Sequence, residues 1–155
     1  MPKLDLDAIP QTNLTGYPPP YDREVEGRWY RRLAPAAGLT SMGASHVVLK
    51  PGAWSSQRHW HAGQDELVVM LAGEAVLVED EGETVIRPGD VLAWPAGARN
   101  GHHLQNRTGE DCVFVAISAG SRDADSGEYP DIDRVFDADG YARKDGTRYE
   151  TTRLP

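Results

Sequence analysis

Apolar and polar residues alternate in short segments through the middle of the chain, and turn-forming residues separate the segments. The alternation predicts strands at residues 28–33, 42–50, 55–61, 66–71, 75–79, 83–87, 90–94, 102–106 and 112–118. Between them lie Pro51-Gly52, Gly73-Glu74, Pro88-Gly89 and similar pairs, which favour turns. Short strands repeated about every 8–12 residues are typical of a sandwich or barrel. The pattern therefore predicts an antiparallel all-β fold.

The two ends of the chain lack this pattern. Three consecutive prolines, Pro18 to Pro20, favour an extended polyproline conformation near the N-terminus. Residues 121–155 are rich in Asp, Gly, Tyr and Arg and hold few apolar side chains. We therefore expect an extended arm over residues 1–28, a barrel over 29–120, and a polar tail over 121–155 that wraps the barrel or a partner subunit.

Composition narrows the classes of function. The 155 residues carry a net charge of −8 without a basic cluster, which argues against binding to nucleic acid or anionic membranes. Apolar runs are too short for a membrane span, and no secretory signal is evident. Cys112 is the only cysteine, which suits a reducing compartment, so we expect a cytoplasmic protein. Exposed apolar strand edges favour a homodimer.

The chemistry with the clearest pattern lies at His59, His61 and Glu66. Side chains alternate faces along a strand, so His59 and His61 point the same way. A small polar turn at residues 62–65 leads into the next strand, which would bring Glu66 beside them. Two imidazoles and a carboxylate on one face form a set of N and O ligands for a metal ion.

A second stretch, from Gly89 to Asn106, completes a resemblance. Gly52, His59, His61, Glu66 and Gly73 follow the spacing of the first motif of the cupin superfamily, with one extra residue after Gly52. Five further residues follow the second motif of the same superfamily: Gly89, Pro95, Gly97, His102 and Asn106. Four residues separate Gly97 from His102 where the motif has two. The chain thus resembles a small single-domain cupin, of the kind described as sugar-phosphate-isomerase-like.

The resemblance implies a double-stranded β-helix, or jelly-roll barrel, with a metal ion inside. Its ligands would be His59, His61, Glu66 and His102. The lengthened loop leaves His103 as the alternative to His102, but the three-residue gap to Asn106 favours His102. Zinc, manganese, iron and nickel all suit three imidazoles and one carboxylate, so the expected cofactor is one divalent transition-metal ion.

Strand alternation also suggests a substrate pocket. Gln57 shares the predicted face of the two histidines, Met70 shares that of Glu66, and Arg99 lies in the loop before His102. We expect these three residues to contact a small-molecule substrate. The acidic net charge and the absence of clustered inward-facing arginines argue against a phosphorylated one.

Three functions remain open on this evidence. The first is an isomerase or lyase in which the metal acts as a Lewis acid on a small hydroxylated or keto compound. The second is an iron- or copper-dependent dioxygenase, and the third is a binding protein without turnover. Ligand spacing does not separate them, and no general base is identifiable from the sequence.

Overall fold

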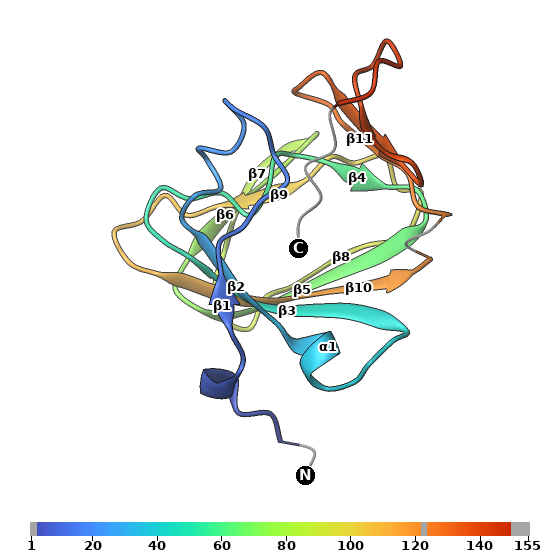
Figure 1. The fold of residues 1–155 in the computed structure, drawn as a ribbon. Coiled ribbons are helices and arrows are strands. Elements are labelled where there is room, and N and C mark those ends of the chain that lie inside the picture. The colour runs from blue at the N-terminus through green and yellow to red at the C-terminus, as the bar shows by residue number, and fades with distance from the viewer. Residues whose placement is uncertain (1–2, 122–123, 150–155) are drawn as a thin grey trace.

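The computed structural model describes residues 3–121 and 124–149, and Figure 1 shows them as a barrel of antiparallel strands. A 3-10 helix (Leu6–Ala8) and an α-helix, α1 (Leu33–Ala36), accompany the strands. The strands are β1 (Gln11–Thr12), β2 (Arg28–Arg32), β3 (Met42–Leu49), β4 (Trp60–His61), β5 (Gln64–Ala72), β6 (Ala75–Glu79), β7 (Gly82–Ile86), β8 (Val91–Trp94), β9 (His103–Gln105), β10 (Cys112–Gly120), β11 (Gly127–Tyr129), β12 (Arg134–Asp137) and β13 (Gly140–Ala142). No helix among the described residues is long and apolar enough to cross a membrane.

One wall of the barrel is a six-stranded sheet in the order β1-β2-β3-β10-β5-β8. Phe114 on β10 pairs with Val47 on β3 and with Met70 on β5, and all three side chains are buried. Alternate residues of these strands therefore form the apolar floor of the barrel, as the period-two pattern predicts.

The opposite wall is less regular. Strands β7, β6 and β9 form one small sheet, and β4 joins β11, β12 and β13 in another. Isolated bridges between His59 and His102 and between Trp54 and Gln105 link these two parts. With the first wall they make the jelly-roll barrel that the motifs implied, so the predicted all-β class is confirmed.

The predicted strand at residues 55–61 is shorter in the structure, where only Trp60 and His61 form β4. The backbone N–H of Gln57 donates to the Tyr17 hydroxyl, and that of Ser55 donates to the Leu104 carbonyl. Each of these N–H groups bonds to a different segment, one to the arm and one to β9. Residues 55–58 therefore run along the wall without the repeated backbone hydrogen bonds of a paired strand.

The arm and the tail both pack on the barrel. On the arm side, β1 pairs with β2, and the Tyr30 hydroxyl donates to the Leu14 carbonyl. On the tail side, β11 pairs with β4 so closely that a Cβ at Gly127 would overlap the Trp60 carbonyl. Figure 1 shows the β11–β13 hairpin beside β4 at one end of the barrel. The division at residues 28 and 120 stays a prediction.

Candidate metal centre

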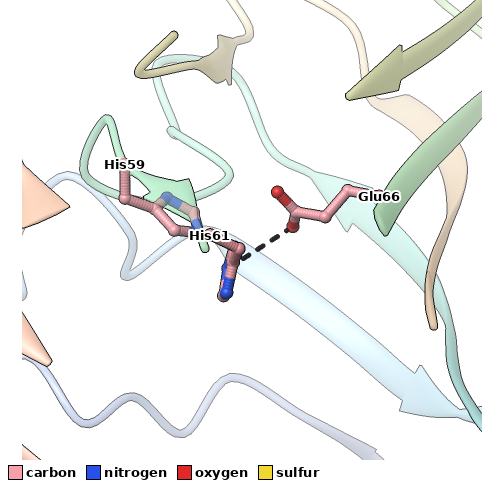
Figure 2. Close-up of side chains that lie close together, drawn as sticks. All are labelled: His59, His61 and Glu66. Atoms are coloured by element: carbon pink, nitrogen blue, oxygen red, sulfur yellow. Dashed lines mark ion pairs between the residues drawn. The ribbon is translucent and has the colours of Figure 1, made fainter. Parts of the chain in front are cut away.

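Three side chains meet where β4 turns into β5. One ligand atom from each of His59, His61 and Glu66 lies within 4.8 Å of the others, which makes them a candidate metal-binding group. Within the group, His61 Nε2 and Glu66 Oε1 lie 3.6 Å apart, a contact drawn as a dashed line in Figure 2. Strand alternation turns both imidazoles to one face, and the turn after β4 returns the chain so that Glu66 lies beside them.

In each imidazole of this group, the Nδ1 atom is hydrogen-bonded to an oxygen atom outside the group. The Nδ1 atom of His59 lies 2.9 Å from the Gln57 carbonyl, and that of His61 lies 2.5 Å from Asp125 Oδ2. A carbonyl or an ionised carboxylate only accepts hydrogen bonds, so Nδ1 carries the proton in both rings. Nε2 is then left with a free lone pair, which is the arrangement that metal-binding histidines have.

Local electrostatics keep these groups in the forms that bind metal. Burial of the ring lowers the pKa of His59 to about 4, so the imidazole is neutral near pH 7. Burial by itself would raise the pKa of Glu66, but the hydrogen bond from His102 and the nearby imidazoles outweigh it and lower that pKa. A neutral imidazole and an ionised carboxylate are what a divalent transition metal requires, so the donor set fits such an ion.

The structure distinguishes His102, which lies just before β9, from His103, the first residue of that strand. His102 Nδ1 donates to the Asn100 carbonyl at 2.9 Å, and its Nε2 lies 2.9 Å from Glu66 Oε2. The indole of Trp94 stacks on the His102 ring with centroids 3.8 Å apart. His102 thus contacts Glu66 from the side, next to the group formed by His59, His61 and Glu66.

His103 has a different environment. Its Nδ1 donates to the Ser56 carbonyl at 2.8 Å, and its ring meets the edge of Trp54 with centroids 4.7 Å apart. Adjacent residues of an extended strand point to opposite faces, so only one of the two histidines can reach Glu66. The contact with Glu66 belongs to His102.

A cavity of about 320 Å³ opens beside the metal-binding group. Its polar lining includes His59, Glu66 and His102. Apolar residues of the six-stranded sheet, among them Val47 and Phe114, form the opposite side. A small molecule in this space would contact the candidate ligands at one end and an apolar floor at the other.

The three predicted substrate contacts lie elsewhere. The Gln57 amide donates to the Tyr21 carbonyl and to Glu24, because the chain has left the strand there and turns this side chain toward the arm. Met70 is 1% exposed and packs within the apolar core. The guanidinium of Arg99 lies over the Trp60 ring, 5.4 Å from its centroid. None of the three is among the described residues that line the cavity.

Residues of the tail that the sequence did not single out surround the histidines. Asp125 is 5% exposed and binds both His61 Nδ1 and the backbone N–H of Gly63, at 2.5 and 2.9 Å. The ring of Tyr129 stacks on His59 with centroids 5.3 Å apart, and Phe136 lies 5.0 Å from His61. No local signal marks Asp125, which is one of several aspartates in a polar segment.

Comparison with protein-family models matches residues 45–118 to the cupin domain. Among solved structures, a protein from Silicibacter pomeroyi, named a sugar phosphate isomerase of the cupin superfamily, is 40% identical. That match covers 99% of this chain and 100% of the other, with a TM-score of 0.89. The matched family model spans the metal-binding group, and the matched structure spans the arm and the tail as well.

More distant structures share the fold. A protein from Acidithiobacillus ferrooxidans, provisionally named a sugar phosphate isomerase, is 26% identical over 82% of this chain and 81% of its own, with a TM-score of 0.70. A predicted oxalate decarboxylase from Thermotoga maritima is 20% identical over 77% of this chain and 99% of its own, with a TM-score of 0.61. At that identity the likeness shows the fold alone. A search of curated proteins found no match.

Proposed function

We propose that this chain, which belongs to the cupin superfamily, is an enzyme that uses one divalent transition-metal ion to act on a small hydroxylated or keto substrate. The reaction would be an isomerisation or a lyase reaction. One observation carries the proposal: His59, His61 and His102 each have Nδ1 directed at an oxygen acceptor, so that Nε2 is the atom left to bind a metal ion. Nε2 of His102 contacts Glu66 at 2.9 Å in this structure and would exchange that contact for the ion. The oxygens that hold these rings are those of Gln57, Asp125 and Asn100.

In this proposal the ligands are His59, His61, Glu66 and His102. Three neutral imidazoles and one carboxylate leave a divalent ion with a net charge near +1. A bound ion of this kind polarises a carbonyl or hydroxyl oxygen. His59, Glu66 and His102 line the cavity, so a substrate oxygen in the cavity would be able to reach an ion held by these residues.

The residues around the cavity determine its shape and its local dielectric environment. An apolar floor that includes Val47 and Phe114 excludes water from one side of the cavity. Trp94 covers His102, and the Trp94 indole N–H donates to Glu79 at 2.8 Å, which fixes the indole in place. A dry site of this kind strengthens the interaction between the metal centre and a polar substrate group.

The relative that is 40% identical supports an isomerase over the other chemistries, because that protein is named a sugar phosphate isomerase and matches this chain nearly end to end. We extend the same substrate class, small sugars and related hydroxy or keto compounds, to this chain as part of the proposal. A cytoplasmic location and a homodimer stay predictions from the sequence.

Metal analysis followed by an activity screen tests the proposal. The purified protein is expected to hold close to one zinc, manganese, iron or nickel ion per chain, and to interconvert a hydroxy and a keto compound without consuming oxygen. Substrate-dependent oxygen uptake with bound iron or copper would replace this proposal by the dioxygenase alternative. Absence of bound metal after growth and dialysis in metal-supplemented buffer would refute metal dependence.

A further inference from the structure

One charged side chain that lines the cavity has no part in the candidate metal centre. Among the described residues that line the cavity, Arg28 is the one lysine or arginine, and Glu66 is the one carboxylate. In the proposed function Glu66 is a metal ligand, so its charge is already used. A divalent ion, Glu66 and Arg28 together give the cavity a charge of about +2. An anionic substrate group would balance it.

Arg28 retains unused hydrogen-bonding capacity. Its Nη1 donates to the Ser55 carbonyl at 2.9 Å, and its Nη2 donates to the Leu14 carbonyl at 3.3 Å. A guanidinium has five N–H groups and stays charged at any physiological pH, so these two bonds leave three N–H groups over. The Nε atom has no partner among the described residues, and none of the ion pairs in the described structure involves Arg28.

Arg28 lies on the six-stranded sheet, but its guanidinium reaches the segment that carries His59. The Ser55 carbonyl that accepts from Arg28 is followed directly by Ser56, whose hydroxyl lies 3.3 Å from His59 Nδ1. Tyr30, two residues along β2, lines the cavity as well. The inward face of β2 therefore presents Arg28 and Tyr30 to a molecule that reaches the metal centre.

We propose that Arg28 binds the carboxylate or phosphate group of the substrate, while a hydroxyl or keto oxygen of the same molecule binds at the metal centre. This inference rests on the proposed function and names its substrate class as small anionic hydroxy or keto compounds. Planar guanidinium groups suit both anions because they donate parallel N–H groups to two oxygens. The sequence argument against a phosphorylated substrate rested on the absence of clustered inward-facing arginines, and Arg28 supplies one cation at the cavity.

A purely structural role is the competing explanation, because Arg28 also ties the arm to the barrel through Leu14. Arg31 offers a matched control on the same strand. It donates from Nε to the arm carbonyl of Ile9 at 3.2 Å, yet it is not among the residues that line the cavity. Replacing either arginine loosens the arm, but only replacing Arg28 removes a cavity cation.

Isothermal titration calorimetry on the full-length protein as purified, with its metal content measured beforehand, separates these roles. The probes are inorganic phosphate and glycolate. Comparing their affinities shows whether the site prefers a phosphate or a carboxylate group. Removing a charged hydrogen-bond donor is expected to raise the Kd of the preferred anion roughly 10- to 100-fold in Arg28→Met. Arg28→Lys keeps the charge and is expected to raise Kd less, and Arg31→Met to leave it unchanged.

Melting temperatures of the three variants show that each is folded at the titration temperature. Unchanged anion binding in Arg28→Met would refute the proposal, and so would equal weakening in Arg28→Met and Arg31→Met. Absence of binding of either anion to the unsubstituted protein would also refute it. Because the metal content of each preparation is measured separately, failure here leaves metal binding and the proposed reaction to be judged by their own experiments.

Discussion

The two walls of the barrel contribute different things. The six-stranded sheet is built from long paired strands whose inward residues, such as Leu49 and Phe114, are buried and apolar. The opposite wall joins short strands through isolated bridges, and it presents His59, His61 and His102. Only Glu66 comes to the metal centre from the regular sheet. Regular pairing thus accounts for the buried core, and the irregular wall carries most of the candidate metal ligands.

The irregular wall is held by contacts from outside it. Arg58 beside β4 forms ion pairs with Asp131 of the tail and with Asp80 after β6. Arg134 of β12 is 1% exposed, donates to the Gly16 carbonyl at 3.0 Å and lies over Tyr141. Side chains from distant parts of the chain replace the hydrogen-bond ladder that this wall lacks.

The largest expected effect is on the regular sheet. Leu49→Ala leaves a cavity at a side chain that is fully buried, and should lower the free energy of unfolding by about 2–5 kcal/mol. Chemical denaturation measures the loss. Val48→Ala, one residue away on the outward face, should cost less, and metal affinity should be unchanged in both folded variants. Weakened metal binding in folded Leu49→Ala would contradict the comparison, because it would show that the regular sheet also determines metal affinity.

The metal-binding group should show the reverse behaviour. His61→Ala and His59→Ala each remove a ligand, so metal affinity should fall by more than the roughly 10- to 100-fold that loss of an outer contact causes. The fold should survive, because the core of the barrel does not include these rings. Elemental analysis after dialysis, with circular dichroism as the folding control, measures both. Full metal content in the two variants would disprove the assignment.

His102 and His103 allow a finer test of the same wall. His102→Ala removes the contact with Glu66 and should weaken metal binding, whereas His103→Ala should leave it unchanged. His103→Ala leaves the buried Ser56 carbonyl without its donor, so it should instead lower stability by about 1–3 kcal/mol. Metal titration and denaturation of both variants give the comparison. The opposite pattern would mean that His103 is the ligand.

The sequence predicted the regular wall better than the irregular one, for a physical reason. Alternation along β3, β5 and β10 is local, so it identified these strands. The same rule, applied to residues 59–61, predicted that His59 and His61 point to one face. The path of residues 55–58 depends on the Tyr17 hydroxyl, which is distant in sequence. Arg28 is an intermediate case: alternation along residues 28–33 places it on the face of Tyr30, but its contact with Ser55 is visible only in three dimensions.

The tail offers the last comparison, because it contacts the candidate metal-binding group without belonging to it. Asp125 accepts from His61 Nδ1 and from the Gly63 backbone N–H. Asp125→Asn removes the negative charge that fixes the His61 tautomer, so metal affinity should fall roughly 10- to 100-fold. Competition titration with a chelating dye measures the affinity.

Asp137→Asn is the matched control for this change, because Asp137 lies in the same tail but pairs with Arg148 at the surface. It should leave metal affinity unaltered. If Asp125 acted only by anchoring the tail to Gly63, the asparagine carbonyl could still accept that hydrogen bond and affinity would stay at the level of the unsubstituted protein. A loss confined to Asp125→Asn, with an unchanged melting temperature, would instead mean that the tail tunes His61 electrostatically, and that the irregular wall is functionally incomplete without residues beyond the barrel.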